Sequence, residues 1–219
     1  MILEAPFMAI ILADDSFQEY PFMTGVIISN QWVLTTAKVL KLQADKRLKI
    51  LTGVSNLSSF DEGNVNSVLY CKLHPQYNSD EIYNDIALIK LARPIVFNEK
   101  EGMLPLMSLN DVPYPPMHYN SKRRNLTVFN YGSALEKQYG VLKKNVIGIN
   151  TGVVNLRESI FVAAQRSIPT CYGDSGSPAI VDGKLVGLLI IEDRCNHNFP
   201  NVFVSILHYY DWIRHVIRY

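Results

Sequence analysis

The sequence predicts an all-β protein that ends in one α-helix. Roughly a dozen short apolar runs, each bounded by turn residues, recur along the 219-residue chain, as in β-sandwiches and β-barrels. Hydrophobic residues make up 48% of the chain and charged residues only 19%, which is enough to build a sizeable core. Helical spacing is absent until the last residues. The predicted strands cover residues 7–12, 26–29, 32–37, 48–54, 68–73, 86–91, 126–131, 146–154, 159–164, 185–191 and 201–207.

Two local signals refine this prediction. Asp182-Gly183 separates two apolar runs and predicts a type I′ hairpin turn, because both residues tolerate a positive φ. Apolar residues at spacings of three and four predict a helix over 206–219, whose Tyr209, Tyr210 and Trp212 we expect to pack against the second group of strands. A proline-rich connection over 105–116 divides the strands into two groups.

Charge and composition exclude several functions. The 21 Lys and Arg residues nearly balance the 20 Asp and Glu residues, so no basic field favours nucleic acid or an anionic membrane. No apolar stretch approaches the roughly 20 residues that span a bilayer. The histidines lack metal-ligand spacing, and we expect neither a metal nor a cofactor.

Asn56 and Asn125 begin glycosylation triplets. Three cysteines allow one disulfide and leave one thiol free or bonded between chains.

Three ordered segments carry a family resemblance. Residues 170–178, TCYGDSGSP, resemble the GDSGGP nucleophile loop of the chymotrypsin-like serine proteases. Residues 31–38, QWVLTTAK, resemble the segment that delivers the catalytic histidine, and residues 84–91, NDIALIKL, resemble the segment that delivers the aspartate. The resemblance covers most of the chain. It implies two antiparallel six-stranded β-barrels with a C-terminal helix, in one domain over 1–219 with sub-lobes at about 1–108, 109–205 and 206–219.

The resemblance assigns a role to each position of the catalytic triad. It places the nucleophile at Ser175, the orienting carboxylate at Asp85, and the oxyanion-hole N–H groups at Gly173 and Ser175. The general base falls at Lys38, where the family has histidine. The ordinary pKa of a lysine is ~10.4. Lowering this pKa far enough for the amine to accept the proton at neutral pH costs about 4 kcal/mol. A neighbouring carboxylate opposes this change, so we expect a Lys38–Asp85 ion pair and an unactivated Ser175.

The substrate-binding positions and the activation segment also depart from the family. Ile190, Ile191 and Glu192 align with the edge that pairs with a substrate, while Asn201 aligns with a glycine of the specificity-pocket wall and Pro169 with its base. We expect this pocket to be blocked. Only five residues precede Pro6, so we expect the family's activating N-terminus to be absent and Asp174 to lack its usual partner. We then expect the loop of Asp174 to be zymogen-like or held another way.

The resemblance pairs Cys171 with Cys195 in a disulfide. Two other family disulfides are replaced by apolar pairs, Met23 with Val39 and Leu126 with Val181. Cys71 has no evident partner, and a buried free thiol is favoured over an intermolecular bridge.

These departures favour a catalytically inactive serine protease homologue that binds a protein partner, such as an active protease or its substrate. The alternative is a serine endopeptidase with residual activity that uses Ser175 and Lys38, since Ser-Lys pairs work on other folds. A third interpretation is that this is a truncated gene product whose start is artificial. In that case the argument from the activating N-terminus fails, while the replacement of histidine by Lys38 remains. Family membership implies secretion, although no clear signal peptide is visible.

Overall fold

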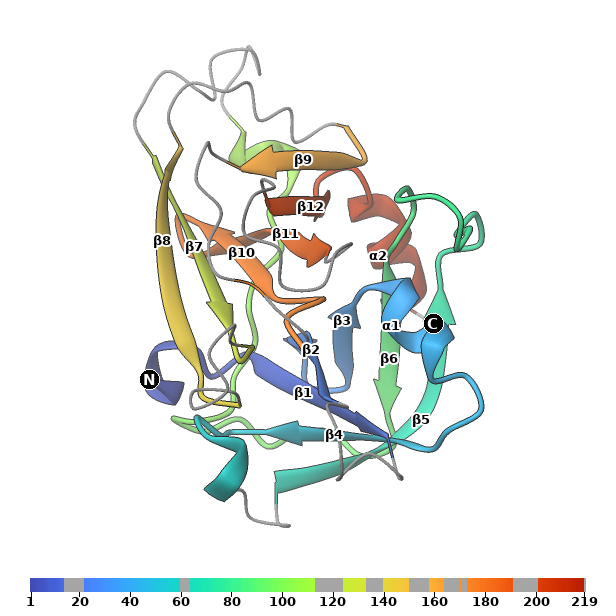
Figure 1. Cartoon of the computed structure of the whole chain (residues 1–219), viewed down its shortest axis with the longest axis vertical. Helices are drawn as coiled ribbons and strands as arrows, with labels where there is room; N and C mark the ends of the chain where they lie inside the picture. Colours follow the sequence, from blue (N-terminus) through green and yellow to red (C-terminus); the bar gives the residue numbers. More distant parts are fainter. Residues whose placement is uncertain are drawn as a thin grey trace.

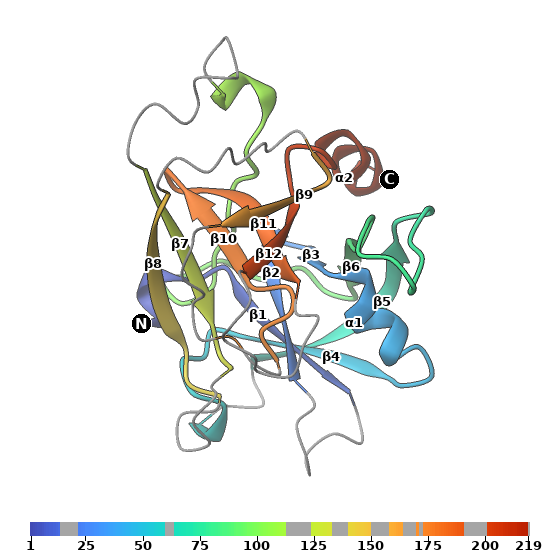
Figure 2. The same ribbon diagram turned by 45° about the horizontal axis from the view of Figure 1, so that its top comes forward.

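The computed structural model consists of a closed six-stranded barrel followed by a second six-stranded sheet and a short helix. It describes residues 1–13, 22–59, 64–112, 124–132, 140–149, 158–163, 170, 173–190 and 201–218. Figures 1 and 2 place the barrel and the second sheet as two adjacent lobes, with the terminal helix at the side. The mainly β prediction is therefore confirmed, and the helix falls where it was expected.

The first lobe closes because each strand pairs with two neighbours, in the order β1-β2-β3-β6-β5-β4 and back to β1. All of these pairings are antiparallel, and Ile10 of β1 lies opposite Thr24 of β2 on one side and Leu51 of β4 on the other. The strands are β1 (Met8–Ala13), β2 (Phe22–Ser29), β3 (Trp32–Thr35), β4 (Leu48–Thr52), β5 (Val65–Leu73) and β6 (Ala87–Leu91).

The second lobe is a sheet in the order β8-β7-β10-β11-β12-β9. In the described part of this lobe no pairing joins β8 to β9. Its strands are β7 (Arg124–Asn130), β8 (Lys143–Ile149), β9 (Ile160–Ala163), β10 (Pro178–Val181), β11 (Lys184–Ile190) and β12 (Asn201–Ser205). Asp182 (φ 49°) and Gly183 (φ 73°) form the β10–β11 turn, which confirms the predicted type I′ geometry.

Two helices complete the fold. Helix α2 (Tyr210–Ile217) is the predicted C-terminal helix, and it buries Ile213 completely. Helix α1 (Ala37–Leu42) was not predicted, because residues 32–37 continue an apolar run without helical spacing. Since α1 is only 6 residues long, its tertiary contacts rather than its propensity stabilise it.

One apolar core joins the two lobes. Buried residues from the barrel, such as Leu34 and Leu88, belong to the same cluster as Leu185 and Val204 of the second sheet and Ile213 of α2. Smaller clusters fill the interior of each lobe separately. Because the shared cluster lies between the lobes, segments that lie far apart in the sequence meet there in a fixed arrangement. No helix in the described segments is long and apolar enough to cross a bilayer.

Candidate active site

Ser175 lies in a loop that is hydrogen-bonded to both lobes. The backbone N–H of Thr24 in β2 donates to the carbonyl oxygen of Ser175 at 3.1 Å, and the Thr24 hydroxyl donates to the carbonyl of Gly173 at 2.7 Å. On the other side, the N–H of Gly176 donates to the carbonyl of Leu189 in β11 at 2.9 Å. These bonds fix the position of the half-buried Ser175 without using its side chain.

Glycine is required at position 176 for two independent reasons. Its φ of 87° lies in the left-handed region that side-chain-bearing residues rarely adopt. A Cβ at this position would also overlap the carbonyl of Thr24 and come within 2.6 Å of the Thr35 hydroxyl. The Ser175 loop therefore passes directly over β2 and β3, and only a glycine allows this approach.

Asp174 is completely buried and is held by the second lobe. Its Oδ2 accepts a hydrogen bond from the Asn130 amide at 2.8 Å, and its Oδ1 accepts one from the backbone N–H of Gly132. The Lys143 ammonium donates to the Gly132 carbonyl at 2.9 Å. Burial lowers the pKa of Lys143, and the negative charge of Asp174 acts in the opposite direction. These groups hold the Asp174 carboxylate from the second lobe.

Asp85, in the first lobe, binds the start of helix α1. It is 2% exposed, and its Oδ1 accepts the backbone N–H of Lys38 at 2.6 Å. This N–H belongs to the first turn of α1, where backbone N–H groups have no partner within the helix. The carboxylate satisfies that donor and interacts favourably with the positive end of the helix.

The expected Lys38–Asp85 ion pair is not observed. The ion pairs between described residues join Lys144 to Glu4, at 2.6 Å, and Lys184 to Asp111. Asp85 is bonded to the backbone of residue 38 and not to its ammonium group. The prediction considered only the charges of the two side chains, whereas the first turn of α1 offers Asp85 a backbone donor at the same position.

The terminal helix holds Asp85 in place through Asn84 and Tyr209. Asn84 has a φ of 58°, which turns the chain before Asp85. The Tyr209 hydroxyl accepts the Asn84 N–H at 2.9 Å and donates to its side-chain oxygen at 3.0 Å. The Tyr209 ring also contacts His74 with a centroid distance of 5.2 Å. Tyr209, the residue before α2, therefore contacts the first lobe in addition to the apolar cluster that both lobes share, whereas the prediction named only the second lobe.

The remaining predicted site positions are only partly described. Ile190 ends β11 and is 5% exposed, while Asn201 begins β12 and donates its side-chain amide to the Thr170 hydroxyl at 3.2 Å. Leu189 accepts the N–H of Gly176 at 2.9 Å and donates its own N–H to the carbonyl of Ser177 at 2.9 Å, so Ile190 directly follows the β11 residue that pairs with the Ser175 loop. Five predicted positions lie outside the described residues: Pro169, Ile191, Glu192, Cys171 and Cys195.

The residues predicted to replace two family disulfides lie in buried apolar clusters. Met23 and Val39 belong to one buried cluster, and Leu126 and Val181 belong to another. Each pair of apolar residues therefore contributes to a buried apolar cluster at the position where the family has a disulfide. Cys71 is a free thiol, as predicted, but it is half-buried instead of buried, and burial raises its pKa to about 11.

The glycosylation candidates differ in their surroundings. Asn125 is exposed in β7, while Asn56 is half-buried and its side-chain oxygen accepts the backbone N–H of Ser58 at 2.9 Å. Within the described ranges, no group of three His, Cys, Asp or Glu side chains is arranged to hold a metal ion.

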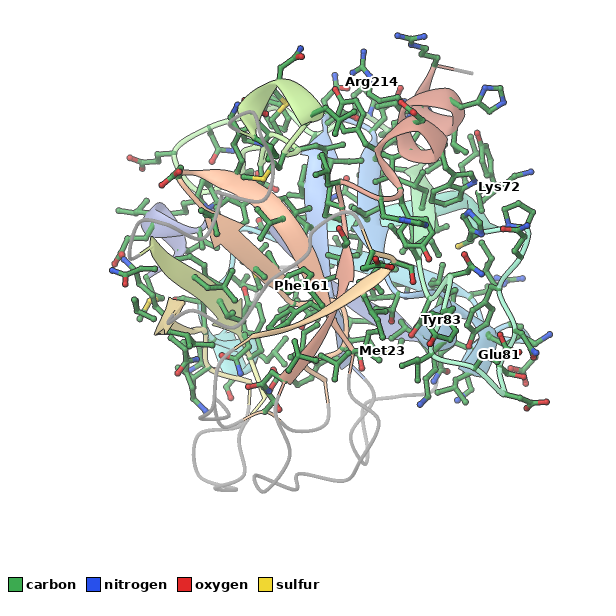
Figure 3. All side chains as sticks on the ribbon, turned by 90° about the horizontal axis from the view of Figure 1, so that it is seen from above. Met23, Lys72, Glu81, Tyr83, Phe161 and Arg214 are labelled. Carbon is green, nitrogen blue, oxygen red and sulfur yellow. The ribbon has the colours of Figure 1, made fainter. Side chains whose placement is uncertain are left out.

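Sequence reasoning missed the residues that support this site. Asn130 and Lys143 act on Asp174 from other strands, and Tyr209, just before the terminal helix, binds Asn84, the residue next to Asp85. No motif identifies such long-range partners, because they are defined by strand pairing and not by spacing. Figure 3 shows the side chains from above, with Phe161 of the second sheet and Met23 of the first lobe labelled.

Comparisons with known proteins agree with this architecture. A family model described as Trypsin matches residues 2–213. The chain is 28% identical over 218 residues to a trypsin of Phaedon cochleariae, with 90% of this chain and 80% of that protein covered. It is also 28% identical over 204 residues to an anionic trypsin of Canis lupus familiaris, covering 90% of this chain and 81% of that protein.

A solved structure shows the same fold. It is described as neuropsin, a serine protease expressed in the limbic system of mouse brain, and it matches with a TM-score of 0.77 at 22% identity. The match covers 99% of this chain and 96% of the neuropsin chain. With the family model matching nearly the whole chain around the Ser175 loop, this chain belongs to the trypsin family of serine proteases.

Proposed function

We propose that this chain is a catalytically inactive member of its family that acts as a protein-binding or regulatory module. The observation that carries the proposal is the pairing of Asp85 with the backbone N–H of Lys38 at 2.6 Å. This bond places the Asp85 carboxylate next to residue 38, the position that should supply the general base. The side chain at this position is the amine of Lys38. Loss of the base alone costs roughly 10⁶-fold in turnover in serine proteases, about 8 kcal/mol of barrier.

The chemistry of the triad explains why an amine is a poor replacement. The base must accept the hydroxyl proton as the nucleophile attacks and then donate it to the leaving amine, which requires a pKa near the working pH. An imidazole meets this requirement, and its second nitrogen can donate to the carboxylate. A lysine has one nitrogen and carries a charge at neutral pH.

The binding partner in this proposal is a protein, such as an active protease of the same pathway or its substrate. The proposed location is extracellular, where the family usually works. Ile190 and Asn201, together with Pro169, Ile191 and Glu192, are proposed to close the specificity pocket that an active relative leaves open.

A residual endopeptidase that uses Ser175 and Lys38 is the second candidate. It is favoured by the relatives named trypsin at 28% identity and by the backbone bonds that hold the Ser175 loop between the lobes. The two candidates differ in one property only, which is whether the Ser175 oxygen reacts.

A fluorophosphonate probe tests this difference. We expect the purified protein to react no faster than its Ser175→Ala variant and to cleave no peptide ester. The Lys38→His variant supplies an imidazole beside Asp85, and a gain of labelling at Ser175 in this variant would show that the base is the missing component. Stoichiometric labelling of the unmodified protein at Ser175, with ester turnover that Ser175→Ala abolishes, would refute the proposal and establish the endopeptidase.

A further inference from the structure

A cavity of about 750 Å³ opens on the first lobe between the segment that follows α1 and strands β4 and β5. Its volume lies in the range of cavities that bind ligands in proteins. None of its lining residues belongs to the Ser175 loop or to the Asp85 region. In Figure 1 the chain between α1 and β4 runs along the edge of the barrel next to β5.

The rim of this cavity is basic. Lys41, Lys46, Arg47 and Lys49 are among its lining residues, and all four are exposed. The described part of the lining contains no Asp or Glu. Lys46 and Arg47 take part in none of the ion pairs between described residues. Four cations around one opening, in a chain whose net charge is only +1, create a local positive potential that attracts an anionic ligand.

The floor of the cavity is apolar. Leu40, which is 4% exposed, lines it together with the half-buried Leu48, Val68 and Leu73. A ligand that only neutralises the rim leaves this surface in contact with water. The ligand that fits best therefore carries an apolar group in addition to negative charge.

A third feature is an acceptor without a hydrogen-bond donor. Gln43 also lines the cavity, and its side-chain oxygen is buried without a hydrogen-bond partner. Buried acceptors are normally paired, so this amide gains a hydrogen bond by turning toward a ligand that brings an N–H group. A phosphate ion brings only charge, and a fatty acid brings charge and an apolar chain. A peptide brings both of these together with backbone N–H donors.

We propose that this cavity, defined by its basic rim, apolar floor and Gln43, binds an acidic peptide segment of a partner protein with one hydrophobic side chain in the floor. The acidic side chains lie on Lys41, Lys46 and Arg47, and a backbone N–H of the peptide donates to Gln43. The site extends the proposed protein-binding function and rests on it for its biological meaning. It is physically separate from the Ser175 loop, so the two proposals have separate readouts.

The first test measures binding of a fluorescent twelve-residue peptide that is rich in glutamate around a central leucine. The Lys46→Gln, Arg47→Gln double variant should weaken binding by roughly fivefold or more, since exposed ion pairs contribute modestly one at a time. Lys72→Gln is the matched control, because Lys72 lies in β5 between two lining residues, is exposed and is not part of the lining. Figure 3 shows Lys72 at the periphery of the molecule. Added salt should weaken binding in the unmodified protein more than in the double variant.

The second test locates the ligand. Cys71 lines the cavity as a free thiol, so bound peptide should slow its alkylation by iodoacetamide at alkaline pH, followed by peptide mapping. The glutamine-for-glutamate peptide and the alanine-for-leucine peptide should protect Cys71 less well than the parent peptide. Protection in the unmodified protein, together with its loss in the double variant, would support the proposal.

Three results would overturn it. Equal weakening by the double variant and by Lys72→Gln would show that the rim has no special role. Unchanged alkylation of Cys71 at a saturating peptide concentration would place the peptide elsewhere on the protein. Protection by decanoate that matches or exceeds the protection by the peptide would assign the cavity to a fatty acid. Labelling of Ser175 by the fluorophosphonate probe would refute the inactive-protease proposal and leave each of these results unaffected.

Discussion

Replacement of Asn130 by alanine should destabilise the protein strongly, because Asn130 supports a buried charge. Its side-chain amide donates to Asp174 at 2.8 Å, and its side-chain oxygen accepts from Asn145 at 2.8 Å. Both Asn130 and Asp174 are 0% exposed, so water does not replace the lost bonds. A hydrogen bond to a charged group contributes about 1.5–3 kcal/mol and a neutral one about 1 kcal/mol. Together these give an expected loss of ~3 kcal/mol in the free energy of unfolding.

Urea unfolding of the Asn130→Ala variant measures this loss as a shift of the midpoint at constant m. Asn125→Ala is the matched control, since Asn125 lies in the same strand and is exposed. In protein produced without glycosylation, this control should change stability by less than ~0.5 kcal/mol. A double-mutant cycle with Asp174→Asn should return a coupling energy of about 1.5–3 kcal/mol.

Two results would refute this reasoning. If Asn130→Ala and Asn125→Ala destabilise the protein equally, the buried carboxylate does not depend on the amide. If the cycle returns no coupling with Asp174, the loss in Asn130→Ala arises from packing alone.

Two further predictions concern backbone conformation and pH. Gly176→Ala should prevent folding, because its Cβ would overlap the Thr24 carbonyl. Gly183→Ala, where a Cβ meets nothing within 4 Å, should cost only the roughly 1–2 kcal/mol of a positive φ. Soluble yield and urea midpoints compare the two variants, and similar losses of stability would contradict the steric argument. Burial, followed by the charge of His208, lowers the pKa of His74, so the folded state binds fewer protons than the unfolded state. This contribution to stability is complete above the ordinary histidine pKa of ~6.5 and is lost as the pH falls below it. His74→Phe should reduce the pH dependence of the urea midpoint in this range, and an unchanged dependence would assign it to other groups.

The network around Asp174 connects these predictions to the proposed function. Asn130, Gly132 and Lys143 hold the residue before Ser175 through the second lobe. Such a loop can remain ordered as a binding element whether or not Ser175 reacts. For this reason the Lys38→His variant is informative, because it changes the base without altering the residues around Asp174.

The sequence by itself determined the family resemblance, the β-rich architecture and the candidate triad positions, since these depend on local motifs and periodicity. The Asp182-Gly183 turn was predicted because two residues define its backbone geometry. The helix of residues 210–217 was predicted from its apolar spacing, which indicates that one face is buried but not which lobe covers it.

The tertiary structure alone decided how the candidate site is held. The contact of Tyr209 with Asn84, across 125 residues, depends on how the terminal helix packs on the first lobe. The bond from the Lys38 backbone to Asp85 depends on a helix too short to leave a periodic signal. The basic residues of segment 41–49 are visible in the sequence, but only the packing of this segment against β4 and β5 makes them the rim of a cavity. Long-range contacts of this kind follow from strand pairing and core packing, which no local pattern of residues specifies.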